Sequence, residues 1–390
     1  MVNKQIDTNR VILLLALAGF ASSCAFRICD PLLPLLSTEF AVSTGQAAQA
    51  VTLFAVAYGI FQFLFGPVGD RYGKYRTITV ATLLCAVGSI GVALAPSMDT
   101  MLFARLLSGA AGAGIVPLSM AWIGDNVDYA ERQPTLARFV SGTIVGMAAG
   151  QLIGGLFADT LGWRWAFVFL AGVYLVVGAL LLVLRPPQSS QVLGQSVGFL
   201  RPMRDVVATP WARVILLTVF CEGALVFGVL AFVPAYVQLR FGLGPTAAGA
   251  VGGVFALGGI FYVVISRRLV QAWGEAGLVR AGGVTLALAF AIYALGASWA
   301  WSVLAGLLCG FGFYMFHNTL QTNATQMVPS RRGTAVALFA CCLFLGQSAG
   351  VASGALLLDG AGPLSLFWGA ALLTPLLGLY FSAVLRRRAG

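Results

Sequence analysis

The chain has 390 residues, of which 59% are hydrophobic and only 9% are charged, and its mean hydropathy is +0.92. A soluble protein carries roughly a quarter charged residues to cover its surface, so this composition excludes a soluble globular protein. The net charge of +10 would be compatible with nucleic-acid binding, but the placement of the basic residues argues against it.

Repeated apolar runs of about 20 residues predict membrane-spanning helices, because a bilayer core needs that length at about 1.5 Å per residue. We therefore expect an all-α membrane protein with twelve transmembrane helices. In chain order, the predicted spans are 11–34, 46–66, 77–96, 100–122, 137–158, 163–184, 213–237, 246–266, 279–297, 300–327, 334–357 and 363–385.

Lysine and arginine gather at the two termini and in alternate loops between these spans. The exceptions among the 23 are Arg164 and Arg240, which fall in the other loops, and Arg27 and Arg105, which fall inside spans. Cytoplasmic loops carry an excess of basic residues, so we expect both termini in the cytoplasm and the protein in a bacterial cytoplasmic (inner) membrane. The positive charge then serves topology and contact with anionic lipid, and we expect no nucleic-acid partner.

The first span contains two charges, Arg27 and Asp30, in "AFRICDPLLPLL". They are three residues apart and so neighbours on one helix face, and Arg105 of the fourth span lies at a similar depth. Intramembrane charges are costly, usually paired, and often mark ion or substrate pathways. One interpretation is a protonation switch at Asp30; the other is a static Arg–Asp clamp that joins the first and fourth spans.

The loop after the second span, "GPVGDRYGKYRT", has a specific pattern of charges and glycines. It resembles the loop signature of the major facilitator superfamily, G-x-L-x-D-R-x-G-R-x-R, with Val68 in place of Leu and Lys74 in place of Arg. The resemblance implies a conformational latch that stabilises an outward-open state; the alternative is a basic loop that only sets topology. The latch residues are Gly66, Asp70, Arg71, Gly73, Lys74 and Arg76.

Two further segments resemble the drug:proton antiporters of this superfamily, the 12-span (DHA1-like) branch. "DPLLP" from Asp30 to Pro34 resembles their first-span motif, and "RLLSGAAGAG" from Arg105 resembles their fourth-span motif. The resemblance implies that Arg105 takes part in proton transfer.

The fifth span, "GTIVGMAAGQLIGG", resembles the antiporter signature G-x-x-x-G-P-x-x-G-G, but Gln151 replaces its proline. This departure weakens the assignment to the antiporters. Glycines at a spacing of four residues also let helices pack closely, which is the alternative interpretation. The glycines concerned are Gly146, Gly150, Gly154 and Gly155.

The second half of the chain contains two other polar sites. Glu222 lies near mid-depth of the seventh span without an obvious partner in its own helix. It is either a second proton carrier, a carboxylate that recognises a cationic group, or a protonated side chain bonded to a backbone carbonyl. The tenth span carries a polar stripe of His317, Asn318 and Gln321. His317 either contacts substrate or is a hydrogen-bonded structural residue.

The remaining wall of a central cavity is expected to be aromatic, which suits an amphipathic organic molecule. The candidates are Phe26, Tyr58, Phe61, Phe227, Tyr262, Phe313 and Tyr314.

The chain also repeats itself at a spacing of 200 residues. Pro34 matches Pro234, and "GIF" at 59–61 matches "GIF" at 259–261. An even number of spans per copy makes the two copies parallel, which places a substrate site between them. We therefore expect two six-helix pseudo-repeats, as bundles 1–184 and 213–390, joined by a cytoplasmic linker, 185–212.

These patterns predict a secondary active transporter that exports a small amphipathic compound, a drug or metabolite, against protons by alternating access. The first alternative is a proton-coupled or facilitative uptake carrier for a small metabolite, and a remote one is a membrane sensor without transport. The sequence contains no nucleotide loop, metal-ligand spacing or catalytic grouping. We therefore expect no enzyme activity, cofactor or metal, and a protein that acts as a monomer.

Overall fold

The computed structural model of the protein describes residues 8–184 and 200–389, and every regular element among them is a helix. In chain order they are α1 (Thr8–Arg27), η1 (Asp30–Leu32), α2 (Leu33–Glu39), α3 (Thr44–Ala47), α4 (Gln49–Tyr72), α5 (Lys74–Ala93), α6 (Met98–Gly112), α7 (Ile115–Asn126), α8 (Tyr129–Thr160), α9 (Trp163–Val183), α10 (Leu200–Ala208), α11 (Pro210–Glu222), η2 (Gly223–Phe227), α12 (Gly228–Leu230), α13 (Val233–Phe241), α14 (Pro245–Gly253), α15 (Phe255–Leu295), α16 (Trp299–Gln326), η3 (Pro329–Arg331), α17 (Arg332–Ala361) and α18 (Pro363–Ala389).

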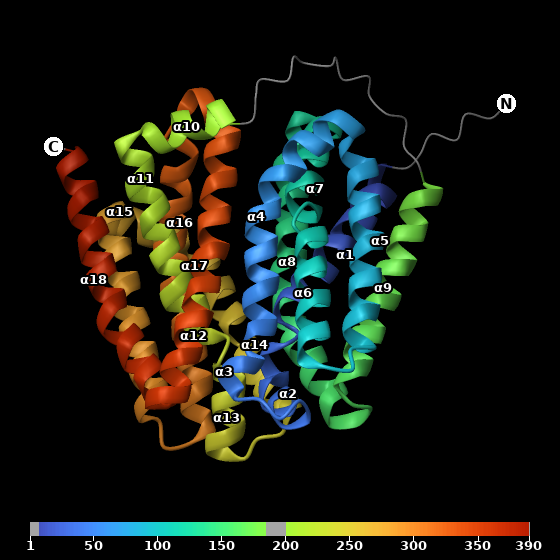
Figure 1. Ribbon diagram of the computed structural model, residues 1–390. Coiled ribbons are helices and arrows are strands. Elements are labelled where there is room, and N and C mark those ends of the chain that lie inside the picture. The colour runs from blue at the N-terminus through green and yellow to red at the C-terminus, as the bar shows by residue number, and fades with distance from the viewer. Residues whose placement is uncertain (1–7, 185–199, 390) are drawn as a thin grey trace.

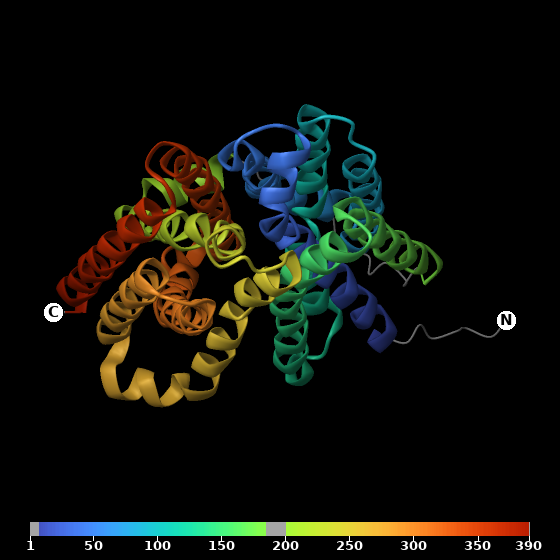
Figure 2. The same cartoon turned by 90° about the horizontal axis from the view of Figure 1, so that it is seen from below.

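Eleven segments of the described residues are long and apolar enough to cross a membrane. One of them, Pro245–Leu295, has 51 residues, far more than the roughly 20 that one crossing needs. Within it Gly274 has φ 61° and ψ 178°, which is not helical, and the gold ribbon in Figure 2 follows a broad bend there. The segment thus holds the predicted spans 246–266 and 279–297, and the fold has the twelve expected crossings.

The first and seventh spans break at equivalent places. α2 begins at Leu33 and α13 at Val233, and each has a proline, Pro34 or Pro234, at one of its first two positions. Proline lacks the backbone N–H and clashes with the preceding turn, so it suits the start of a helix and interrupts a longer one. Breaks 200 residues apart are what two copies of one six-span unit require.

The helices gather into two groups (Figure 1). We call α1–α9 the N bundle and α10–α18 the C bundle. The first described helix begins and the last one ends at the same end of the molecule, here called the terminal end, where the bundles stand apart. At the opposite end, here called the closed end, the bundles meet through α2 and α3 of the N bundle and α13 and α14 of the C bundle. Between the bundles, α4 packs on α17 and α8 packs on α14.

The division into domains at 184 and 213 remains a prediction. Residues 185–199 of the predicted linker lie outside the described residues, as do Lys4 and Arg185 among the charges used for topology. The rest of the predicted linker, residues 200–212, forms α10 and the start of α11.

Candidate functional site

A buried polar cluster surrounds Asp30 in the N bundle. The Asp30 side chain is fully buried and Arg27 is 4% exposed. Asp30 Oδ2 accepts two hydrogen bonds, from Arg27 Nη1 at 3.1 Å and from Gln151 Nε2 at 3.0 Å. Asp30 Oδ1 has no hydrogen-bond donor among the described residues, so the carboxylate retains one free acceptor.

The local chain path explains how Arg27 and Asp30 meet. α1 ends at Arg27, and the chain enters the short 3₁₀ helix η1 at Asp30, with Pro31 at its second position. The pair forms an i, i+3 ion pair across this break. The sequence spacing predicted this neighbourhood, and the break places the carboxylate beside α8, which supplies Gln151.

Arg105 binds other partners than the Asp30 carboxylate of the clamp interpretation. Its Nη1 donates to the carbonyl of Ala25 at 2.9 Å and its Nε to that of Ala50 at 3.0 Å, while its guanidinium lies 4.0 Å from the ring centre of Phe54. The static Arg–Asp clamp between the first and fourth spans is therefore wrong in its partner. Arg105 joins α6 to backbone carbonyls of α1 and α4, because its flat fork of donors reaches both at once.

Gln151 belongs to the Asp30 cluster, although the sequence did not predict this contact. It was noted only as a departure from a proline in a motif, yet its amide binds Asp30. Its Oε1 faces α14, where a Cβ on Gly252 would lie 2.1 Å away. No periodicity or motif pointed to this contact, which joins residues 121 positions apart.

A second buried pair lies in the C bundle. Glu222 Oε2 lies 2.7 Å from His317 Nδ1, and the Glu222 side chain is fully buried. The imidazole stacks on Phe313 with 4.7 Å between ring centres. The partner of Glu222 is thus an imidazole from another span, and not the backbone carbonyl of the alternative interpretation. Glu222 lies at the start of a π-helical turn, Gly223–Phe227, and such turns occur frequently at functional sites.

A small cavity of about 30 Å³ lies between the two bundles. Arg27 and Gln151 form part of its N-bundle wall and Phe227, Phe255 and Tyr314 part of its C-bundle wall. The Arg27 guanidinium lies 4.8 Å from the ring centre of Phe227, so a cation from one bundle contacts an aromatic face of the other. The wall combines apolar surface with a few polar groups.

The other predicted cavity residues lie outside the wall of this cavity. Phe26 and Tyr58 pack against each other with 5.4 Å between ring centres, and both are buried. Tyr262 is buried in a separate small cluster, and Phe61 is 39% exposed. His317, Asn318 and Gln321 lie nearer the end of α16, and Gln321 is exposed.

The predicted latch loop joins α4 to α5 at the terminal end. Gly73 has φ 90°, a conformation that favours glycine, and Gly66 has no side chain or backbone close to where a Cβ would lie. Lys74 forms an ion pair with Asp125 of its own bundle, and the Arg71 guanidinium lies over the ring of Tyr72. Asp70 and Arg76 are exposed.

The glycines of α8 face two different neighbours. A Cβ on Gly146, Gly150 or Gly154 would lie 2.3–2.6 Å from a backbone carbonyl oxygen of Phe20, Cys24 or Ile28. A Cβ on Gly155 would lie 2.2 Å from the carbonyl oxygen of Pro245 in the C bundle. Three of these glycines therefore seat α8 on the first span, and the fourth seats it on the opposite bundle.

Within the part of the chain that the structure describes, no group of three or more His, Cys, Asp or Glu residues could hold a metal ion. The polar side chains in the cavity wall are Arg27, Gln151 and Tyr314, and Arg27 and Gln151 both bind the Asp30 carboxylate. Such an arrangement can exchange protons and hydrogen bonds.

Two parallel bundles of membrane-crossing helices, with buried charges and a cavity between them, define a membrane transporter. The sequence pattern that describes the Major Facilitator Superfamily matches residues 15–351, and the chain belongs to this superfamily. It is 26% identical over 305 residues to the uncharacterized MFS-type transporter YwfA of Bacillus subtilis, covering 75% of this chain and 73% of the relative. It is also 25% identical over 360 residues to the MFS-type transporter YceJ of the same organism, covering 88% and 87%.

Two further comparisons agree with this assignment. The inner membrane transport protein YnfM of Escherichia coli is 26% identical over 251 residues, which cover 64% of this chain and 59% of the relative. The crystal structure of the nucleoside transporter NupG superposes with a TM-score of 0.78 over 96% of this chain and 99% of its own, at 13% identity. That likeness concerns the fold.

Proposed function

We propose that this protein is a secondary active transporter that exports a small amphipathic organic compound in exchange for protons by alternating access. The observation that carries the proposal is the Asp30 carboxylate, which is fully buried and bound by Arg27 and Gln151. Carboxylates inside a membrane are costly and commonly mark ion pathways.

The position of Asp30 supports coupling between a proton and the movement of the bundles. The carbonyl of the next residue, Pro31, accepts a hydrogen bond at 2.8 Å from Gln238 of the C bundle. On the other side, Gln151 binds Asp30 and also faces Gly252 of the C bundle. A proton on Asp30 would change the hydrogen bonds of residues that touch the opposite bundle.

The chemistry of the cavity wall supports an amphipathic substrate, and the small cavity must widen when the bundles move in order to admit one. Its wall includes Phe227, Phe255, Leu230 and Met147, and its polar groups include Arg27 and Gln151. Sites with apolar walls and a few placed polar groups bind organic molecules by burying their apolar surface and orienting one polar end. We propose that the compound places a polar or anionic group near Arg27.

The orientation is part of the proposal. With both termini in the cytoplasm, the closed end faces outward, and the contacts between the bundles in this structure belong to an inward-facing state. Asp70 and Arg71 of the latch loop then lie at the end where the bundles stand apart, as a latch of the outward-open state requires. We propose that a single copy of the chain carries out the cycle.

Uptake of a small metabolite is the second candidate, and Gln151 favours it. The antiporter signature has proline at this position, and α8 continues as a helix through residue 151. The proline is the residue that distinguishes the antiporter signature from an ordinary helix packed through glycines, and this chain lacks it.

The test uses the full-length protein in liposomes that contain the pH-sensitive dye pyranine. A panel of lipophilic cations, lipophilic anions and neutral metabolites is added outside, and compound-dependent proton movement is recorded. We expect at least one compound to move protons with the parent protein and not with Asp30→Asn. The control variant is Asp99→Asn, at an exposed residue in the first turn of α6, and it should behave as the parent.

Inverted membrane vesicles then distinguish export from uptake. An exporter accumulates the compound inside such vesicles when a pH gradient is imposed, and an uptake carrier does not. Transport that is independent of the gradient, and equal in the parent and Asp30→Asn, would overturn the proton-coupled proposal.

A further inference from the structure

We propose that Asp159 and Asp359 are a matched pair of positioning residues that hold the two bundles together at the closed end. Each aspartate lies near the end of a long helix of one bundle and binds the start of a helix of the other bundle. The transport cycle must release both contacts each time the closed end opens. The inference rests on the alternating access in the proposed function, and on neither its coupling ion nor its substrate.

The first contact joins the C bundle to the N bundle. Asp359 of α17 accepts a hydrogen bond from the Ser43 hydroxyl at 2.5 Å and one from the Gly45 backbone N–H at 3.2 Å. Ser43 caps the helix that starts at Thr44, and the apolar segment Thr44–Tyr72 continues from there across the membrane. The carboxylate therefore lies at the N-terminus of the second span.

The second contact joins the N bundle to the C bundle. Asp159 of α8 accepts a hydrogen bond from the Thr246 backbone N–H at 2.7 Å. The cap residue of α14 is Gly244, which has no side chain to bind this N–H. The first N–H groups of a helix need an acceptor from outside the helix, and Asp159 supplies it from the opposite bundle.

The two contacts are copies of each other at the spacing of the internal repeat. Asp159 and Asp359 are 200 residues apart, and the backbone N–H groups that they bind, those of Thr246 and Gly45, are 201 residues apart. Close backbone packing accompanies each one. A Cβ on Gly155 would lie 2.2 Å from the Pro245 carbonyl oxygen, and a Cβ on Gly45 would lie 2.8 Å from that of Ala355.

This symmetry gives the pair its mechanical effect. The two halves of a parallel repeat are related by an axis along the membrane normal, so two equivalent contacts lie on opposite sides of that axis. One contact alone would allow the bundles to pivot about it. Two contacts hold the closed end at both sides.

The exposure of the two carboxylates makes the contacts reversible. Asp159 and Asp359 are both exposed, so water can solvate each carboxylate as soon as its contact opens. A buried ion pair would instead leave an unsolvated charge at that moment, at a high cost. A carboxylate at a helix N-terminus is favourable but modest in strength, which suits a contact that biases a conformational equilibrium without locking it.

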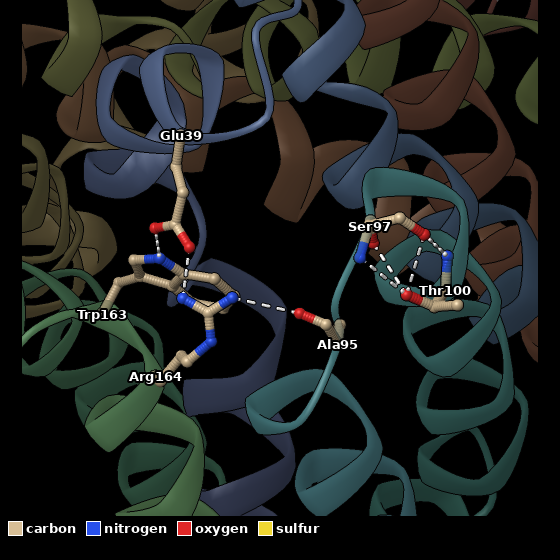
Figure 3. Close-up of polar contacts among 6 residues, drawn as sticks. All are labelled: Glu39, Ala95, Ser97, Thr100, Trp163 and Arg164. Atoms are coloured by element: carbon tan, nitrogen blue, oxygen red, sulfur yellow. Dashed lines mark hydrogen bonds and ion pairs between the residues drawn. The ribbon is translucent and has the colours of Figure 1, made fainter.

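A matched control exists at the same end of the molecule. Glu39 forms an ion pair with Arg164 and accepts a hydrogen bond from Trp163 Nε1 at 2.5 Å, and Arg164 also donates to the Ala95 carbonyl at 3.0 Å (Figure 3). All of these residues belong to the N bundle. Removing the Glu39 carboxylate thus breaks a comparable contact that does not cross between the bundles.

The experiment measures the distance between spin labels at the closed end of the full-length protein in lipid nanodiscs, without substrate. The labels are attached at Asp99→Cys and Leu295→Cys, both exposed, with the two least buried native cysteines, Cys221 and Cys342, replaced by alanine. We expect Asp159→Ala and Asp359→Ala each to raise the ratio of open to closed populations about fivefold, and the double variant about 25-fold. Glu39→Ala should leave the ratio unchanged.

Two further comparisons keep the outcome decisive. Asp359→Asn keeps one of the two acceptor oxygens that Ser43 and Gly45 use and removes the charge, so its ratio should lie between those of the parent and Asp359→Ala. An unchanged ratio in the folded double variant, or an equal shift in Glu39→Ala, would overturn the proposal. Because no substrate or proton gradient is present, a shifted ratio supports the pair even where the proposed transport reaction fails its own test.

Discussion

Glu222 Oε2 and His317 Nδ1 lie 2.7 Å apart and join α11 to α16 in the interior of the C bundle. Each side chain would be costly in this position without the other, because an unpaired buried polar group loses its hydrogen bonds to water. Replacing either residue alone therefore leaves the other without its partner, although the two lie 95 positions apart in the sequence.

The first prediction concerns this pair. His317→Phe leaves the fully buried Glu222 without its partner and should lower the free energy of unfolding by about 3 kcal/mol. In the double variant with Glu222→Leu, the new ring can stack on Phe313 as the imidazole does, and most of the loss should be recovered. Unfolding in mixed detergent micelles measures both. Losses that simply add would contradict the coupling.

The second prediction concerns Arg105, which is 1% exposed. Arg105→Lys should lower the free energy of unfolding by about 2 kcal/mol, because a lysine cannot donate to the Ala25 and Ala50 carbonyls with the same planar fork. Thermal unfolding in detergent measures the change. The control is Arg138→Lys, at an exposed residue bonded to the Pro134 carbonyl of its own helix, and equal effects of the two variants would refute the role given to Arg105.

The third prediction compares adjacent glycines in α14. A Cβ on Gly252 would lie 2.1 Å from Gln151 Oε1, whereas a Cβ on Gly253 has its nearest neighbour at 3.5 Å. The methyl group of Gly252→Ala should therefore displace the Gln151 amide from its place between α8 and α14 and raise the open population at the closed end several-fold, while Gly253→Ala should leave it near the parent value. The spin-label distance described above reports both, and indistinguishable distributions would contradict the prediction.

The fourth prediction compares two glycines of α8. A Cβ on Gly150 would lie 2.4 Å from the Cys24 carbonyl oxygen, whereas Gly142 has nothing within 4 Å of that position. Gly150→Ala should destabilise the protein because two backbones must separate. Gly142→Ala should stabilise it by about 0.5–1 kcal/mol, because alanine is the better helix former. Melting temperatures in one detergent check both signs, and a change of the same sign in both would be the contrary result.

Much of the fold follows from short-range patterns. Apolar runs of spanning length and the alternation of basic loops predicted twelve crossings. The match of Pro34 with Pro234 at a spacing of 200 residues predicted a repeat, and the breaks at these two prolines are a finding of the structure. The i, i+3 spacing of Arg27 and Asp30 likewise predicted their contact. These features depend either on residues close in sequence or on the thickness of the bilayer, which sets the length of each span.

The partners across the fold did not follow from the sequence. One of the two interpretations, the static clamp, paired Arg105 with Asp30, but Arg105 binds the Ala25 and Ala50 carbonyls. Every residue has a backbone carbonyl, so the sequence does not indicate which carbonyls a buried arginine will bind. Gln151 was seen only as a departure from a motif, although it donates to Asp30.

The sequence by itself determined the membrane environment, the repeat and the superfamily, since hydrophobic length, charge placement and motif spacing are properties of local segments. Only the tertiary structure decided which polar groups meet: Glu222 with His317, Asp159 with Thr246, and Asp359 with Ser43. The physical reason is that such a contact depends on how helices rotate and approach one another. That rotation results from the packing of whole bundles, including glycines such as Gly155 that admit a neighbouring backbone.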